Sequence, residues 1–143
     1  MNIRELMEAF SRKSGNELRD ICRENSEKLS DFFDENNVNQ DYRSAYCQGL
    51  WRLFVSADRC TRGDEYNLFL ASIGFTEKEF SKDRFFEMTD KGADPDFVNW
   101  FVRETNKFPI DIQYAVCTIG VCIMSVDEDV TDDEVKLLER LLA

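Results

Sequence analysis

The chain has 143 residues, of which 43% are hydrophobic and 13% aromatic, and its formal net charge is −11. This composition excludes a disordered chain and predicts one folded domain over residues 1–143. The negative charge excludes binding to nucleic-acid backbones and anionic membrane surfaces, and the absence of histidine excludes Ser-His-Asp and Cys-His catalysis within this chain.

Apolar residues recur every three or four positions, which is the spacing of amphipathic helices. In the first half, the pattern predicts helices over residues 3–12 and 17–33. Asp41 is a candidate N-cap for a third helix over residues 42–57. A fourth helix is expected over residues 64–73, and the scarcity of proline and glycine agrees with a helical chain.

The second half carries clear start signals for helices. Thr76 and Glu79 fit a capping box that opens a fifth helix ending near Asp90. Asp94 followed by proline predicts an N-cap and the first position of a sixth helix, which stops before Pro109.

The last two predicted helices differ strongly in character. The segment 111–126 is apolar almost all round, which is typical of a helix at the centre of a domain. Thr131 and Glu134 fit a second capping box, which opens a final helix through Leu141. With no convincing strand, the sequence predicts an all-α, single-domain bundle of about seven to eight helices.

The cysteines and the apolar runs bear on location. The five cysteines are Cys22, Cys47, Cys60, Cys117 and Cys122. Four of them, all except Cys60, sit among apolar residues, so we expect free, buried thiols of a reduced intracellular protein. No run reaches the length of a membrane span and the N-terminus lacks a signal-like apolar region, so we expect a cytoplasmic protein without membrane insertion.

Two segments of the chain are similar to each other. Shifted by 69 positions, "SADRCTRGDEYNLF" (Ser56–Phe69) aligns without a gap on "SVDEDVTDDEVKLL" (Ser125–Leu138). The identities pair Ser56 with Ser125, Asp58 with Asp127, Asp64 with Asp133, Glu65 with Glu134, and Leu68 with Leu137. An apolar helix precedes each segment and an amphipathic helix follows, so we predict two pseudo-repeated helix-turn-helix units.

The turn of the second unit is dense in acid. Six of the eight residues from Asp127 to Glu134 are carboxylates. The aspartates in the first-turn positions of the last helix, and Glu134 itself, are explained by favourable interaction with the positive end of the helix. Asp58 and Asp127 lie near helix C-termini, where the macrodipole disfavours negative charge and a nearby cation would offset it.

Two interpretations of the acidic turns therefore remain open. In one, the acids are helix caps and a solvated charged face. In the other, oxygen ligands hold a divalent cation such as calcium, magnesium or manganese. The candidate metal ligands are Asp58, Glu65, Asp127, Asp129 and Glu134. An EF-hand is excluded, since Asp132 stands where its loop needs glycine and Leu138 where it needs glutamate.

These segments resemble the TerB-like tellurite-resistance family, whose members are small, acidic, all-helical bacterial domains with two pseudo-repeated halves. The family pattern is an apolar helix ending in Ala-Asp, a short acidic turn, and a glutamate that opens an amphipathic helix. Ala57, Asp58 and Glu65 match this pattern in the first copy, and Asp127 and Glu134 match it in the second.

The turns depart from the family pattern. Arg59 and Glu128 stand where the family usually has glycine, and Val126 replaces the alanine in the second copy. The turns must therefore close differently. The resemblance implies a proposed metal-binding or contact surface at the matching acids, and it implies no catalytic reaction.

The sequence thus predicts a non-enzymatic binding module of a bacterial stress-response or tellurite-resistance type. No P-loop, dinucleotide fingerprint or GxSxG motif occurs. The alternative is an acidic interaction protein of the immunity or inhibitor type, whose charge of −11 matches a basic protein partner. A hydrolase that uses carboxylates and a divalent ion is a third, weaker hypothesis.

Overall fold

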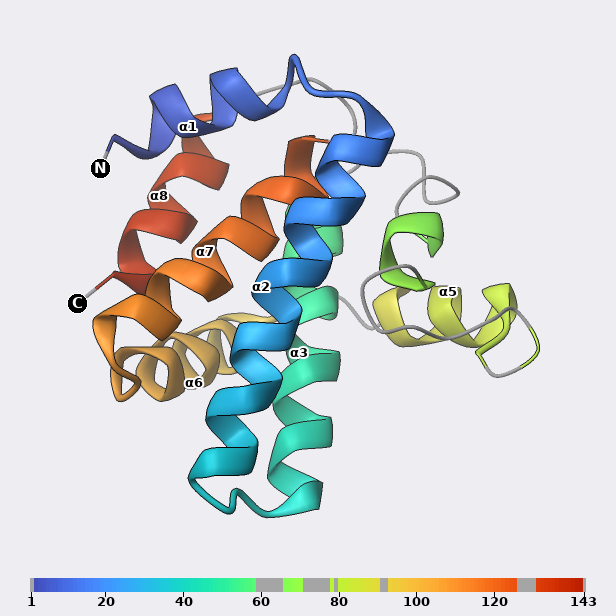
Figure 1. Ribbon diagram of the computed structural model, residues 1–143, viewed down its shortest axis with the longest axis vertical. Coiled ribbons are helices and arrows are strands. Elements are labelled where there is room, and N and C mark those ends of the chain that lie inside the picture. The colour runs from blue at the N-terminus through green and yellow to red at the C-terminus, as the bar shows by residue number, and fades with distance from the viewer. Residues whose placement is uncertain are drawn as a thin grey trace.

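The computed structural model describes residues 2–58, 66–70, 78, 80–90, 93–125 and 131–142, with side chains in the first range described as far as residue 55. Every regular element within these ranges is a helix, which confirms the predicted all-α class. Figure 1 shows the helices gathered into a bundle. The pseudo-repeat of the two acidic units stays a prediction, because both turns lie outside the described residues.

The centre of the bundle is α7 (Ile110–Met124). Its neighbours are α1 (Ile3–Phe10), α2 (Gly15–Glu35), α3 (Gln40–Asp58), α6 (Pro95–Asn106) and α8 (Asp132–Leu141). From residue 115 to residue 125 every side chain is buried except that of Thr118, which is half-buried. A helix that is apolar all round can only be stable with neighbours on every side, and this confirms its predicted central position.

Short polar signals set where α2 and α3 begin. Ser14 and Glu17 form a capping box, and for this reason α2 starts at Gly15, two residues earlier than predicted. The prediction of Asp41 as the N-cap of α3 was wrong. The helix begins at Gln40, and the side chain of Asn39 accepts a hydrogen bond from the Asp41 N–H at 2.8 Å.

The next two helices differ in how well their starts were predicted. The carboxylate of Asp94 accepts a hydrogen bond from the Phe97 N–H at 2.8 Å, and Pro95 is the first residue of α6, as expected. In contrast, α5 begins only at Lys82 and runs to Asp90. The capping box predicted from Thr76 and Glu79 lies outside the described residues.

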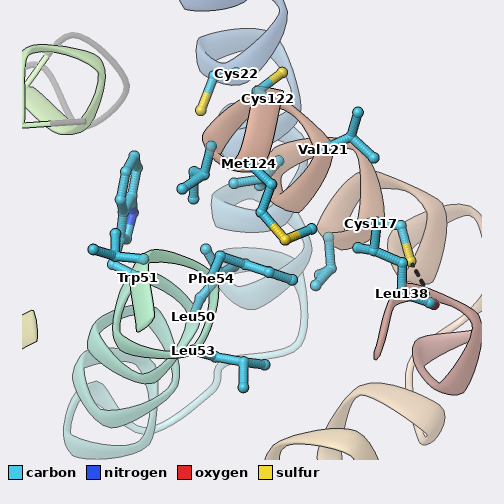
Figure 2. Packing of buried hydrophobic residues seen from close by; sticks show 14 of the residues in the cluster. Cys22, Leu50, Trp51, Leu53, Phe54, Cys117, Val121, Cys122, Met124 and Leu138 are labelled. Atoms are coloured by element: carbon cyan, nitrogen blue, oxygen red, sulfur yellow. Dashed lines mark hydrogen bonds between the residues drawn. The ribbon is translucent and has the colours of Figure 1, made fainter. Parts of the chain in front are cut away.

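The contact between α3 and α7 is close. Phe54 of α3 faces Met124 of α7 (Figure 2). Gly120 permits this approach, since a Cβ atom added there would lie 2.5 Å from the ring of Phe54. A larger residue at this position would push the two helices apart.

A side unit, formed by the helical residues 66–70 and by residues 80–90, packs beside α3 on the opposite side of the bundle from α8 (Figure 1). Trp51 of α3 links it to the bundle through ring contacts with Phe69 at 5.0 Å and Phe85 at 6.3 Å. The hydroxyl of Tyr66 donates a hydrogen bond to the Phe80 carbonyl at 2.6 Å. The side unit thus has a small aromatic core of its own.

Burial of the cysteines agrees with prediction at three described positions and differs at one. Cys22, Cys117 and Cys122 are buried, whereas Cys47 is exposed. Cys47 lies on the solvent side of α3, because its neighbour Tyr46 occupies the side that faces the core. Within the described part of the chain, no helix is long and apolar enough to cross a membrane.

Candidate functional site

The start of α8 is built by the predicted capping box. The N–H and the hydroxyl of Thr131 both donate hydrogen bonds to Oε1 of Glu134, at 3.1 and 2.8 Å. In return, the Glu134 N–H donates to Thr131 Oγ1 at 3.2 Å. Glu134 is only 2% exposed, so one oxygen of a buried carboxylate serves to fix the first turn of the helix.

The two aspartates before Glu134 point to solvent. Asp132 and Asp133 are exposed, and Arg4 of α1 forms an ion pair with Asp132. The pair is largely exposed on both sides, with side-chain exposures of 43% and 80%, so it adds little to stability. It does place a basic side chain of α1 beside the acidic start of α8.

The other border of the acidic turn is the end of α7. Ser125 is the C-cap of this helix and only 4% exposed. Among the described residues, its Oγ has no hydrogen-bond partner. Buried hydroxyls are almost always hydrogen-bonded, directly or through water or an ion, so a polar ligand at this end of α7 would satisfy an otherwise costly group.

The structure describes only part of the predicted ligand set. Glu134 is described in full, and Asp58 is described as the last residue of α3, which confirms its predicted place at a helix C-terminus. Glu65, Asp127 and Asp129 lie outside the described residues. Convergence of the five acids on one ion therefore stays a prediction. Among the side chains that are described, no group of three or more Cys, Asp and Glu is placed to hold a metal ion.

A second polar constellation, between α3 and α6, was not foreseen. The hydroxyl of Tyr42 donates to Oε1 of Glu104 at 3.0 Å, and Nζ of Lys107 donates to Oε2 at 2.8 Å. The hydrogen bond from Lys107 is the main cause that lowers the pKa of Glu104, with Tyr42 adding to it against the effect of burial. Burial, followed by the bond to Glu104, raises the pKa of Tyr42.

This constellation joins α3 to α6 through the Glu104 carboxylate. Tyr42 and Lys107 each donate to one oxygen of the Glu104 carboxylate, so both of its oxygens are engaged. The Glu104–Lys107 spacing of three was visible in the sequence, whereas Tyr42 lies 62 positions from Glu104 and gave no signal.

Comparison with known proteins identifies no relative. No protein-family model, curated protein or solved structure matches the chain. The resemblance to the TerB-like family therefore stays a prediction carried by the acidic segments alone.

Proposed function

We propose that this chain is a non-enzymatic binding module of the bacterial stress-response type and that it binds a divalent cation where α7 passes into α8. The observation that carries the proposal is the buried hydroxyl of Ser125, which has no partner among the described residues. It stands at the end of a helix, two positions before the segment Asp127–Glu134, in which six of eight residues are acidic.

The chemistry of this end of α7 favours a hard cation. The last carbonyls of a helix carry partial negative charge, and a hydroxyl oxygen adds a neutral ligand. Asp127 and Asp129 follow closely enough in the chain to supply charged oxygens. Oxygen ligands of these kinds suit calcium, magnesium or manganese. In this proposal Glu134 fixes the start of α8, since its Oε1 already accepts two hydrogen bonds from Thr131.

The first acidic turn is proposed as a second, weaker site. Asp58 and Glu65 occupy the positions of Asp127 and Glu134 in the predicted repeat. Arg59 and Arg62 lie between them, so a basic side chain is available there as a counter-ion. We therefore expect any response to a cation to depend mainly on the second turn.

Thermal unfolding tests the proposal. The melting temperature is measured in EDTA and with calcium, magnesium and manganese for the wild type, Asp127→Asn and, as a control, Asp31→Asn, which removes an exposed acid of α2. A cation at about 100 times its Kd should raise the melting temperature by roughly 5–10 °C. This shift should vanish in Asp127→Asn and persist in Asp31→Asn.

Ser125→Ala gives a second test, because it should raise stability without a cation and reduce the stabilisation that a cation provides. Without a cation, the variant should be more stable than the wild type by about 1 kcal/mol, because a buried hydroxyl without a partner is removed. With a cation, its gain in melting temperature should be smaller than that of the wild type. Equal melting of all variants in EDTA and in every cation would refute the proposal.

A second candidate function, an acidic interaction protein that binds a basic protein partner, is favoured by the surface of α2. Between residues 20 and 35 this helix exposes six carboxylates and two basic side chains. The exposed acids are Asp20, Glu24, Glu27, Asp31, Asp34 and Glu35. Such a face attracts basic partners by charge, and its binding should weaken with salt and ignore chelators.

A pair of variants with equal net charge tests this second function. Binding to a basic model protein, hen lysozyme, is measured at low and high salt for Glu27→Gln/Asp31→Asn on α2 and for Asp83→Asn/Glu87→Gln on α5. All four side chains are exposed. A larger loss for the α2 pair would support a dedicated acidic face. Equal losses would show that only the overall charge matters, and would refute it.

A further inference from the structure

Two of the buried cysteines are neighbours inside the bundle. Cys22 of α2 and Cys122 of α7 are both 0% exposed, and they lie next to each other where the two helices cross (Figure 2). The thiol of Cys122 is influenced electrostatically by the neighbouring thiol of Cys22. The third buried cysteine, Cys117, has a different partner, since its thiol donates to the Leu138 carbonyl at 3.6 Å.

Contact between two thiols differs chemically from contact between other small core residues. A disulfide requires Cβ atoms about 3.5–4.5 Å apart, and at such a separation rotation about the two Cα–Cβ bonds can turn the sulfurs toward each other. Valine or alanine would fill the same space without this property. Because both residues lie in helices that pack against each other, the bond would form between segments that are already held in place.

We propose that Cys22 and Cys122 are a redox-sensitive pair, which a hydroperoxide converts to a disulfide that joins α2 to α7. One sulfur, as the thiolate, attacks the O–O bond and becomes a sulfenic acid, while the other oxygen leaves and takes up a proton to give water or an alcohol. The second thiol then attacks the sulfenic sulfur, which forms the S–S bond and releases water. The two thiols lose two electrons and two protons, and the hydroperoxide takes them up.

The surroundings of the pair set when this reaction takes place. The neighbouring thiol of Cys22, together with burial, raises the pKa of the Cys122 thiol well above its ordinary value, and Lys13 acts in the opposite direction. The thiolate is therefore scarce while the helices are packed. Oxidation requires a local opening of the α2–α7 contact, so the pair responds to oxidant and loosened structure together.

The disulfide would have a large effect on stability. It would close a loop from residue 22 to residue 122, which includes α3, α5 and α6. Cross-links over loops of this length restrict the unfolded chain strongly, and the melting temperature should rise by roughly 5–15 °C. The oxidised protein would be locked in the folded state under the conditions that loosen the reduced protein.

Oxidation of the folded protein tests the inference. In a Cys47→Ser/Cys60→Ser parent, hydrogen peroxide is added under native conditions, and intact mass and peptide mapping follow the loss of two hydrogen atoms. We expect one bond, Cys22 to Cys122, with retained helicity and a higher melting temperature. Cys117→Ala in the same parent should still form it, and Cys122→Ala should not.

Two results would overturn the inference. One is a folded parent that keeps all three remaining thiols in peroxide while the same protein, unfolded in guanidinium, is oxidised. The other is a cross-linked product that has lost its helical signal, because the bond would then belong to a misfolded state. Peptide mapping of the parent identifies the disulfide without any substitution in the core. The inference is therefore tested even if Cys122→Ala folds poorly.

Discussion

Replacing Gly120 by alanine probes how closely α3 and α7 approach. The added Cβ atom would lie 2.5, 2.6 and 2.9 Å from three atoms of the Phe54 ring. Carbon atoms attract each other best at about 3.5–4.0 Å, so the methyl group and the ring would overlap by about 1 Å. Phe54 is 0% exposed, and its ring cannot turn away into solvent.

The expected magnitude follows from two opposing effects. Forcing an extra methyl group into a packed core costs about 1–3 kcal/mol, and an overlap of this size belongs at the upper end. Alanine in a helix interior gains about 1 kcal/mol over glycine. The free energy of unfolding should therefore fall by about 2 kcal/mol, which lowers the melting temperature of a chain of this size by roughly 4–8 °C.

Gly49→Ala is the matched control. Its added Cβ atom would lie 3.0 Å from the end of the Phe97 ring, which is half-buried and can shift by a few tenths of an ångström. The same gain in helix propensity then offsets the strain, and the free energy of unfolding should change by no more than about 0.5 kcal/mol.

Urea and thermal unfolding, followed by far-UV circular dichroism, compare the two variants. Phe54→Leu is added to the wild type and to Gly120→Ala, because a smaller side chain at residue 54 should relieve the overlap. The double-mutant cycle should show a favourable coupling of about 1 kcal/mol or more. If Gly120→Ala is as stable as Gly49→Ala, or if the coupling is absent, the reasoning that Gly120 is needed for a close contact with Phe54 is refuted.

For three further variants the structure predicts the direction in which stability, or its dependence on pH, should change. Tyr46→Phe removes a buried hydrogen bond of 2.7 Å to Thr105 and should lower the free energy of unfolding by about 1 kcal/mol; an unchanged urea midpoint would contradict this. In Glu104→Gln, the free energy of unfolding should fall less steeply than in the wild type as the pH is lowered. The Lys107 hydrogen bond lowers the pKa of Glu104, so its contribution is complete above the ordinary carboxyl pKa and is lost as the pH falls through the lowered value. Unfolding curves measured down to about pH 2 check the slope, which must differ from that of the wild type. Thr131→Ala should cost about 1 kcal/mol in thermal or urea unfolding and Thr131→Ser much less, and equal losses would argue against the cap.

Local signals in the sequence predicted most helix starts, because a cap uses residues only three positions apart. Asp94 and Thr131 behave as expected for this reason. Asp41 failed because several polar residues compete before α3, and Asn39 supplies the capping oxygen. The exposure of Cys47 was missed because apolar neighbours occur on both sides of it in the sequence, whereas burial depends on the exact angle around the helix.

The candidate site was harder to predict, since it depends on contacts between distant parts of the chain. The capping box of Glu134 is local and was predicted, but its almost complete burial comes from the packing of α8 against the bundle. Whether Asp58 and Asp127 approach a common ion depends on how two turns 69 positions apart are placed. No periodicity within one helix contains that information.

The link between the side unit and the bundle also provides an optical probe. The chain has two tryptophans, and Trp51 is the buried one that contacts Phe69 and Phe85. In Trp100→Phe the fluorescence would come from Trp51 alone. Detachment of the side unit would expose this indole to water and shift its emission to longer wavelength while the helicity of the bundle persists. One side chain therefore makes the docking of the side unit measurable separately from global unfolding.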